Sequence, residues 1–312
     1  MLYGKARLDL EEGKTRKSYA LLSWLVTIIL LCSLTVIGIL YRNKITPLES
    51  ELKEIQIVSS LRIHLLEAIE AEKNAVLAIT DESSKTYADE ARGASNKVEN
   101  ARRDLVTIIQ QAGTSKEQET VAEFNSCWME FRKLDEEILE LATQNSNLKA
   151  QKLSSAQFYR EVAAFEKSLR TLIQQDMQNN HPGFISVHSY ESIIAILEVF
   201  ALHKKHIEEP DDQEMDRIER KMKDYLDTAK KALHELRSIP KLRGNAELVN
   251  AESAYKRIVE INAEVVRLSR LNTNIKSAAL SLGKKRLISA KCQEILGALQ
   301  AMIESHRFKA TR

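Results

Sequence analysis

The side chains best suited to chemistry are scattered along this sequence rather than grouped in a motif. Of the seven histidines, only His203 and His206 stand three residues apart on a predicted helix. A transition-metal site there would need a third ligand and a less cationic setting than Lys204 and Lys205 provide. We therefore predict a solvated helix face at this pair and no metal site.

The three cysteines do not form a metal or redox pattern, because none belongs to a Cys-x-x-Cys pair. The sequence thus indicates no disulfide framework. Cys32 lies in an apolar segment, whereas Cys127 and Cys292 could be oxidised only if the fold brings them together.

Catalysis and nucleic-acid binding are both disfavoured. The sequence contains no Gly-rich phosphate loop, no Gly-x-Ser-x-Gly and no His-Glu-x-x-His. With 46 Lys and Arg against 44 Asp and Glu, the formal net charge of +2 lacks the basic excess of a nucleic-acid-binding protein. We predict that the protein is not an enzyme, uses no cofactor and binds no nucleic acid.

The elements that position these side chains are predicted to be helices. The 312 residues include only 9 Gly and 4 Pro, and aromatic residues make up 5% of the chain. So few breakers leave little room for the turns of a sheet protein, whereas the abundant Ala, Leu, Glu, Lys, Gln and Arg favour helices. We therefore predict an all-α protein.

One apolar segment indicates where in the cell the protein is expected to lie. Leu21–Tyr41 carries no formal charge and, at about 1.5 Å per residue, is long enough to cross a bilayer. We predict a transmembrane helix over 19–42 and a cytoplasmic tail over 1–18, whose Lys and Arg residues favour that side. A cleaved signal peptide, followed by a soluble coiled coil, is the alternative, although its apolar region would be shorter.

No second apolar run of that length stands out in the sequence. We therefore predict a single-pass protein of the cell inner membrane, with its N-terminus cytoplasmic. The bulk of the chain is expected to be periplasmic or extracellular.

Breakers divide the rest of the chain into six predicted helices, whose apolar residues recur in steps of three and four. That spacing is typical of antiparallel bundle packing. The third and sixth helices are the long ones. The predicted ranges are 46–79, 84–112, 116–178, 186–207, 211–238 and 245–308.

The chain also repeats itself. Asn145-Ser-Asn-Leu-Lys149 recurs 127 residues later as Asn272-Thr-Asn-Ile-Lys276. The two halves are therefore copies of one helical unit. Two long and four short helices predict two stacked four-helix-bundle modules that share the two long helices. The expected parts are a domain over 46–308, its membrane-proximal module over about 46–145 and 273–308, its distal module over about 146–272, and a tail over 309–312.

Asn145 and Asn272 fall near the midpoints of the two long helices. We predict that they lie at the module junction, because an asparagine in an apolar seam costs stability unless it is paired. The alternative is that both belong to ordinary helix–helix turns, which would give eight helices in two consecutive bundles.

Val58–Ile173 resembles the four-helix-bundle sensor domain of methyl-accepting chemotaxis proteins. Leu61 and Arg62 precede an Ala- and Glu-rich helix, and Trp128 leads to the Asn-rich junction. The doubled unit is similar to the helical bimodular form of that domain, and related regions occur in sensor histidine kinases. The resemblance implies a membrane-anchored sensory homodimer that binds a small solute or a periplasmic solute-binding protein.

Receptors of this kind continue into a second membrane helix and an output region, whereas this sequence ends at Arg312. We therefore expect either that the protein signals through a partner or that it is a truncated receptor.

The resemblance also implies a ligand slot between the helices of one module. A small organic anion or an amino acid would need Arg or Lys donors beside the apolar seams. In the alternative interpretation, each such side chain merely lies along the surface. The loop Asn179–Phe184 is the candidate surface for a binding protein. The candidate ligand-binding residues are Arg62, Arg102, Arg170 and Lys230.

A function of another class fits the same helices, namely a structural or scaffolding rod in a membrane assembly, without a ligand. A buried polar-lined cavity would favour the sensor. A uniformly apolar seam with an exposed apolar stripe would favour the rod.

Overall fold

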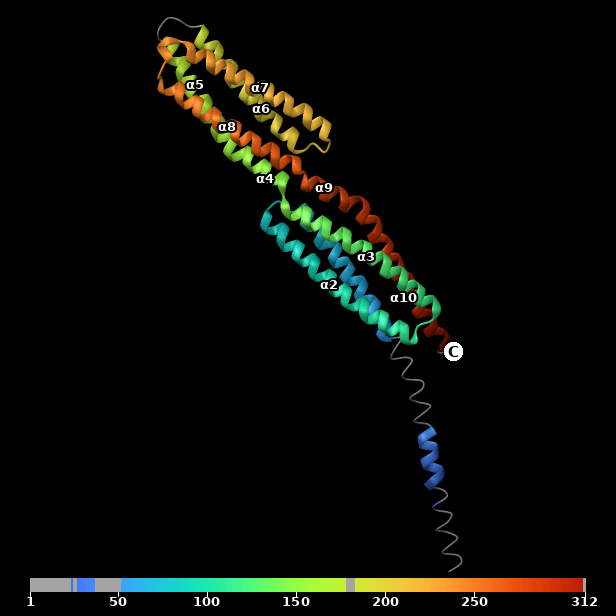
Figure 1. The fold of residues 1–312 in the computed structure, drawn as a ribbon. Helices are drawn as coiled ribbons and strands as arrows, with labels where there is room; N and C mark the ends of the chain where they lie inside the picture. The colour runs from blue at the N-terminus through green and yellow to red at the C-terminus, as the bar shows by residue number, and fades with distance from the viewer. Residues whose placement is uncertain (1–23, 25–26, 37–51, 178–182, 311–312) are drawn as a thin grey trace, which may run out of the picture. The chain divides into compact units, whose positions relative to one another are not determined.

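The computed structural model describes residues 24, 27–36, 52–177 and 183–310, and within them the secondary structure is helical, without a strand (Figure 1). The all-α prediction is confirmed. A helix covers 52–77. The elements after it are α2 (Asp81–Ala112), α3 (Ser115–Gln144), α4 (Ser146–Leu153), η1 (Ser154–Phe158), α5 (Tyr159–Met177), α6 (Phe184–Ile207), α7 (Asp212–Ser238), η2 (Pro240–Leu242), α8 (Ala246–Leu271), α9 (Thr273–Leu280), η3 (Ser281–Lys285) and α10 (Arg286–Ala310).

Local sequence explains where α2 ends and α3 begins. A Cβ on Gly113 would lie 2.6 Å from the carbonyl oxygen of Ile109, so only glycine fits there. Thr114 and Glu117 then form a capping box: the Thr114 amide donates to the Glu117 carboxylate (2.7 Å), and the Glu117 amide donates to the Thr114 hydroxyl (3.3 Å).

The two long helices predicted over 116–178 and 245–308 are each interrupted by one left-handed asparagine. Asn145 (φ 49°) separates α3 from α4, and Asn272 (φ 55°) separates α8 from α9. The prediction of unbroken helices is therefore wrong in this respect. A single residue replaces the helix–helix turn that the eight-helix alternative requires, because asparagine tolerates the left-handed region.

The chain divides into two compact units. The larger contains 62–99 and 123–295, and the smaller contains 1–61, 100–122 and 296–312. The predicted module boundary at Asn145 and Asn272 falls inside the larger unit and stays a prediction.

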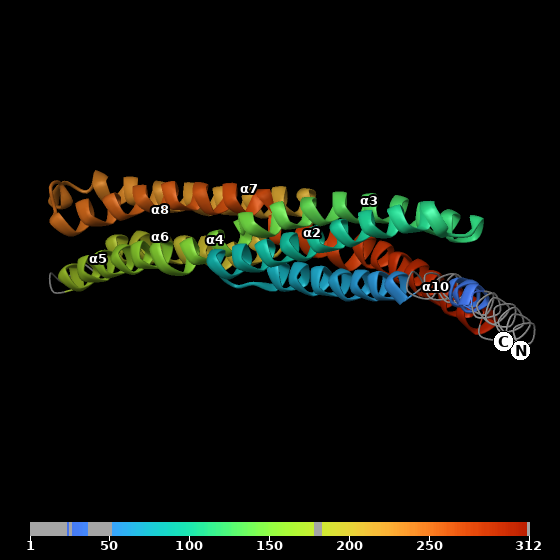
Figure 2. The same cartoon turned by 90° about the horizontal axis from the view of Figure 1, so that it is seen from below.

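In the larger unit, α5, α6, α7 and α8 form a four-helix ring. Contacts join α6 to α7, α5 to α8, α5 to α6 and α7 to α8. Figure 2 shows α7 and α8 on one side of this ring and α5 and α6 on the other. Aromatic and branched side chains, including Phe165, Leu169 and Ile196, fill its core. The helix over 52–77 and α2 instead pack through alanines such as Ala75 and Ala91, with Leu139 of α3.

The smaller unit has a buried core of its own, drawn from the helix over 52–77, α2, α3 and α10. Along each helix, the described core residues follow one another at spacings of three or four, as expected from the sequence. They are Val58, Leu61, Leu105, Ile109, Val121, Leu296, Leu299 and Ile303.

One disulfide lies within the larger unit. It joins Cys127 of α3 to Cys292 of α10, and both residues are buried. The prediction that no disulfide framework exists therefore misses this bridge, because a separation of 165 residues leaves no local pattern to detect.

The predicted transmembrane helix over 19–42 is described only at 24 and 27–36, where it is helical and exposed. The hydroxyls of Ser33 and Thr35 donate to carbonyl oxygens of the same helix, so both hydroxyls are paired within it. The tail over 1–18 and most of the loop Asn179–Phe184 lie outside the described residues.

Among the described helices, α6 is long and apolar enough to cross a membrane, with a mean hydropathy of 1.5. The prediction that no second apolar run exists is therefore wrong by this measure. α6 is nevertheless one of the four helices of the ring described above, and its inner face buries residues such as Ile193, Ile196 and Val199 there.

Candidate functional site

Two π-helical turns occupy equivalent places in the repeat. η1 begins at Ser154 and η3 at Ser281, which are 127 residues apart. A π-turn inserts one extra residue into a helix and is frequent at functional sites. Each of these turns carries buried polar side chains into the larger unit, and the two sets form one candidate site in two copies.

The first set, called the His203 layer, comprises Ser154, Phe158, His203 and Asn262, and all four are buried. His203 Nδ1 lies 2.8 Å from the Ser154 hydroxyl, and Nε2 lies 2.9 Å from Asn262 Oδ1. The Phe158 ring contacts the imidazole edge to face, with centroids 4.2 Å apart.

The charge of His203 follows from this setting. Burial lowers the pKa of His203 to about 4, although the bond to Asn262 opposes the shift. The imidazole is therefore neutral near pH 7. Because Asn262 Oδ1 only accepts, Nε2 is the donor and Nδ1 accepts from the Ser154 hydroxyl.

The second set, called the Lys285 layer, comprises Glu72, Ser95, Phe131, Asp135 and Lys285. Lys285 forms an ion pair with Asp135, and both side chains are buried. The Ser95 hydroxyl donates to Asp135 Oδ2 at 3.1 Å. The Lys285 ammonium also lies 3.6 Å from the centroid of the Phe131 ring, which is the geometry of a cation–π contact.

The repeat makes the two layers comparable position by position. Asp135 corresponds to Asn262, and Lys285 corresponds to Phe158, each with the offset of 127. Each layer therefore combines residues of both copies, and the equivalent positions are neutral in the His203 layer and charged in the Lys285 layer.

Glu72 is the unsatisfied member of the Lys285 layer. Its side chain is fully buried, and neither carboxyl oxygen has a hydrogen-bond partner. Burial raises the pKa of Glu72, whereas the positive charge of Lys285 and the nearby Ser281 hydroxyl, which does not reach hydrogen-bond geometry, oppose that shift. Burial also lowers the pKa of Lys285 against the opposing effect of Asp135. A buried carboxyl is costly when ionised, so Glu72 holds its proton more tightly here than an exposed glutamate does.

A groove lies beside the His203 layer. Its volume of about 670 Å³ lies within the range of roughly 300–1,000 Å³ that is usual for small-molecule sites, and its wall is mainly apolar. Ser154, whose hydroxyl bonds to His203, is part of the wall. Gln151, Ser155 and Lys204 add polar groups along it.

The junction between the two copies is held by reciprocal hydrogen bonds. The Ser146 amide donates to Thr273 Oγ1 and the Thr273 amide donates to Ser146 Oγ, both at 3.1 Å. The amides of Asn147 and Asn274 donate in the same way to each other's Oδ1, at 3.1 and 3.2 Å. The first turns of α4 and α9 therefore cap each other, which satisfies amides that a helix start leaves open.

The two predicted junction asparagines take part in the same network. Asn145 Oδ1 accepts from Asn274 Nδ2 at 3.0 Å, and Asn272 Oδ1 accepts from Asn147 Nδ2 at 2.8 Å. Asn145 and Asn272 are buried. Asn272 is bonded through both its oxygen and its nitrogen, whereas Asn145 is bonded through its oxygen and its buried Nδ2 has no hydrogen-bond partner among the described residues.

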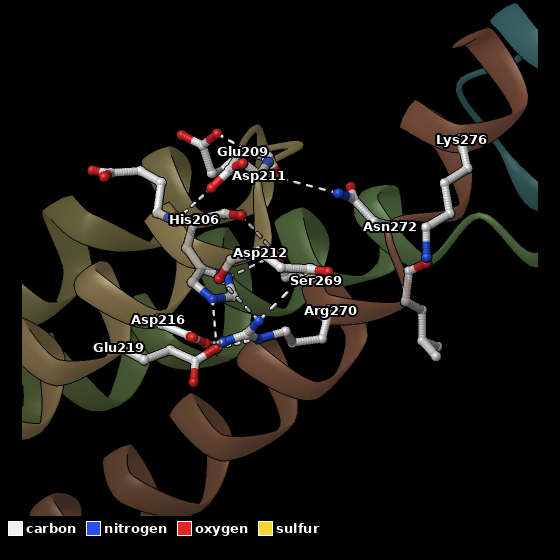
Figure 3. A network of polar contacts seen from close by, with 12 residues as sticks. His206, Glu209, Asp211, Asp212, Asp216, Glu219, Ser269, Arg270, Asn272 and Lys276 are labelled. Atoms are coloured by element: carbon white, nitrogen blue, oxygen red, sulfur yellow. Dashed lines mark hydrogen bonds and ion pairs between the residues drawn. The ribbon is translucent and has the colours of Figure 1, made fainter.

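A second network closes the end of the ring next to this junction (Figure 3). His206 lies between Ser269 Oγ and Glu219 Oε1, at 2.8 Å from each. Arg270 Nε donates to the same Glu219 oxygen at 2.6 Å and forms an ion pair with Asp216. Burial lowers the pKa of His206 despite Glu219, and the bond to Glu219 raises the pKa of Arg270. These contacts join α6, α7 and α8.

The histidine prediction is therefore wrong in part. His203 and His206 are 1% and 0% exposed, not on a solvated face. Within the described residues, no cluster of three metal-ligating side chains occurs.

The four cationic candidates do not converge on one described cavity. Arg62 is exposed and Arg102 is half-buried. Arg170 is exposed and donates to Glu166 one helical turn away, at 2.7 Å. Lys230 lines a groove of about 540 Å³ on α7 and α8, which also contains Arg237.

Comparison with known proteins places the chain in a family. A family model described as a four helix bundle sensory module for signal transduction matches residues 20–181. The chain belongs to this family of sensory modules. The predicted resemblance to chemotaxis sensor domains is confirmed, whereas no curated protein matches the chain.

Neither the His203 layer nor the Lys285 layer of this sensory module was predicted from the sequence. Asp135 follows Trp128 and Phe131 in the heptad of the α3 seam, and Glu72 follows Leu65 and Ala68 in the preceding helix. A charged residue at a seam position could have indicated the buried Asp135 and Glu72, because a side chain at such a position is buried with the core.

Proposed function

We propose that this sensory module is a membrane-anchored, extracytoplasmic receptor domain of chemoreceptor type that binds a small solute. Membership of the signal-transduction family supports sensing. The uncharged segment Leu21–Tyr41 supports the anchor. The buried disulfide supports an oxidising compartment, because structural disulfides are rare in the cytosol.

The groove beside the His203 layer is the proposed binding site for the ligand. It is large enough for a metabolite, and Lys204 lines it together with Glu208, whose carboxylate lies 3.9 Å from the Lys204 ammonium. A small organic anion or an amino acid would place its apolar part against Phe200 and its charged end toward Lys204. The groove at Lys230 is the second candidate for such an anion, and Arg62, Arg102 and Arg170 remain candidates without a described cavity.

A ligand beside η1 would act on a helix already distorted by a π-turn. A ligand that fits one arrangement of α4, η1 and α6 better than another would increase the fraction of molecules in that arrangement. We propose that a homodimer passes this small shift to a partner protein in or at the membrane.

A ligand screen on the full chain in detergent micelles tests this proposal. The melting temperature would be followed by tryptophan fluorescence against amino acids and organic acids. A ligand of the folded state adds about 2.7 kcal/mol of stability at a hundredfold excess over its dissociation constant.

Two variants locate the site. Ser155→Phe fills the groove beside η1, and Lys230→Glu reverses the charge of the other groove, so the shift should disappear in one variant and persist in the other. If no solute in a broad panel shifts the melting temperature, direct sensing is contradicted.

The scaffolding rod remains the second candidate, because α6 exposes large apolar side chains, among them Ile194 and Leu197. The buried polar layers favour the sensor, since a purely structural seam gains nothing from an unpaired Glu72. A rod would melt identically with and without every solute.

A further inference from the structure

The His203 layer also reaches a groove on the other side of the four-helix ring. This groove has a volume of about 500 Å³, lies between α7 and α8, and includes Asn262 in its wall. We name it the opposite groove. The groove beside η1 lies between α6 and the segment that η1 continues into α5, so the two grooves occupy opposite seams of the ring.

Hydrogen bonds connect the two grooves through the core. Ser154 belongs to the wall of the groove beside η1, and its hydroxyl lies 2.8 Å from His203 Nδ1. On the other side of the imidazole, His203 Nε2 lies 2.9 Å from Asn262 Oδ1. All three residues are buried. Three side chains are therefore enough to join one groove to the other.

The direction of these bonds decides what each end of the chain offers to a ligand. The Ser154 hydroxyl donates its single hydrogen to His203 Nδ1, so toward its own groove it can only accept. Asn262 accepts from His203 through Oδ1, and no other hydrogen bond of Asn262 occurs among the described residues. Its Nδ2 is not fully enclosed, so it is an open donor in the wall of the opposite groove.

The two ends keep opposite characters whichever nitrogen of His203 carries the proton. With the proton on Nδ1, Ser154 would accept from the imidazole and donate to its groove. Asn262 would turn its amide over to donate to Nε2, and its oxygen would face the opposite groove. An acceptor bound at Asn262 therefore favours a donor bound at Ser154, and the converse holds.

The charges of the opposite groove suit an anion. Its two acidic side chains, Asp216 and Glu219, both form ion pairs with Arg270. Its two cationic side chains, Arg220 and Lys223, form no ion pair within the described part of the chain. The cations of this groove are thus available to a ligand, whereas the acids are already neutralised.

We propose that the opposite groove binds a small carboxylate, and that the chain of Ser154, His203 and Asn262 couples this site to the groove beside η1. The carboxylate accepts from Asn262 Nδ2 and from the free cations, and its apolar part lies against Met222 and Leu226. Hydrogen bonds in a chain strengthen one another, so an anion at Asn262 makes the Ser154 oxygen a better acceptor.

This coupling deepens the proposed function, on which it rests in one respect: the groove beside η1 is taken as the solute site. With a carboxylate in the opposite groove, that site should prefer a solute that presents an N–H or O–H group to Ser154. Linkage makes the effect reciprocal, and couplings of this kind typically change an affinity by about fivefold or more.

Carboxylate binding to the full chain in detergent micelles tests the site. Isovalerate and benzoate are the probes, because each joins a carboxylate to a small apolar group, and isothermal titration calorimetry gives their affinities. Changing Arg220 and Lys223 together to glutamine should weaken binding by about tenfold or more. Lys221→Gln is the matched control, because Lys221 is exposed on the same helix and lies outside the groove.

NMR of isotope-labelled histidine tests the coupling without a second solute. The ring signals of His203 are those that disappear in His203→Gln. A saturating carboxylate should move the signals of both ring nitrogens, because Nε2 faces Asn262 and Nδ1 faces Ser154. In Asn262→Leu it should leave both in place. His234, which lines the separate groove at Lys230, is the control and should not respond.

Every result supports or overturns the proposal. Failure of both probes to bind at millimolar concentrations, or parent-like binding by the double variant of Arg220 and Lys223, would overturn the site. A bound carboxylate that leaves the His203 signals in place would overturn the coupling. If Ser155→Phe abolishes binding and the double variant retains it, the carboxylate lies beside η1, so this inference fails while the proposed function is supported.

Discussion

At the residue scale, Glu72 should make the protein less stable as the pH rises. Its pKa is raised in the folded state, so the folded protein holds the proton more tightly than the unfolded chain does. Below the unfolded pKa near 4.5 the acid is neutral in both states, so its ionisation adds no penalty. As the pH rises toward the folded pKa, the penalty grows by about 1.4 kcal/mol for each unit of difference.

Glu72→Gln should remove that penalty. Its urea midpoint should exceed that of the parent at pH 7 and match it near pH 4. Glu70→Gln, on an exposed position of the same helix, is the control and should follow the parent at both pH values. A Glu72→Gln variant that is less stable than the parent at pH 7 would show that the ionised carboxylate contributes to the layer.

His203 gives a pH dependence of the opposite sign. Its folded pKa of about 4 lies below the ordinary histidine value of 6.5, so the unfolded chain binds the proton first as the pH falls. Stability is complete above about pH 6.5 and falls by up to about 3 kcal/mol as the pH drops toward 4. The lowered pKa of His206 adds to this loss with the same sign.

Urea denaturation between pH 7.5 and 5 checks the role of His203. His203→Gln should be less stable than the parent at pH 7.5, because the bonds to Ser154 and Asn262 are weakened. It should also lose less stability on acidification. The exposed His234→Gln is the control, and a parent-like acid slope in His203→Gln would contradict the assignment.

At the element scale, Asn145 should be replaceable by glycine more easily than by alanine. Both changes remove the bond from Asn274 to Asn145 Oδ1, but only alanine also incurs the left-handed backbone cost of about 1–2 kcal/mol. Thermal melts should therefore rank the parent above Asn145→Gly and Asn145→Gly above Asn145→Ala. Equal melting of the two variants would mean that α3 and α4 can join without the left-handed residue.

The helices themselves were largely predictable from the sequence. Apolar steps of three and four and the few breakers located them to within a few residues, for example α6 at 184–207 against 186–207 predicted. The breaks at Asn145 and Asn272 could not be predicted in the same way. An asparagine in the middle of a helix can pair with a neighbouring helix whether its backbone is helical or left-handed. The amides that decide the outcome come from residues 127 positions away.

The candidate site was less predictable than the helices. The sequence search favoured Arg and Lys beside the seams, whereas the buried polar groups are Glu72, Asp135 and Lys285 within them. The histidine pair was misjudged because Lys204 and Lys205 suggested a solvated face. A helix turns only 100° per residue, so two lysines can face water while His203 and His206 face the core.

At the scale of the whole molecule, the disulfide restricts which helices can move. It fixes α3 to α10 at Cys127 and Cys292, and the Lys285 layer joins the same two segments through Asp135. The His203 layer has no such covalent bond. A ligand-driven shift is therefore easier among α4, η1 and α6 than between α3 and α10, which agrees with the proposed site beside η1.

The disulfide should also dominate the stability of the larger unit. Closing a loop of 165 residues removes much of the freedom of the unfolded chain, which corresponds to about 5 kcal/mol in the chain-entropy model and to about 2–4 kcal/mol in typical measurements. Replacing both Cys127 and Cys292 with alanine should lower the urea midpoint accordingly, and Cys32→Ser should leave it unchanged.

In protein purified from membranes without reductant, alkylation after denaturation should modify Cys32 alone. Three modified cysteines would mean that this part of the chain does not reside in an oxidising compartment, and the extracytoplasmic location would then fail together with the bridge.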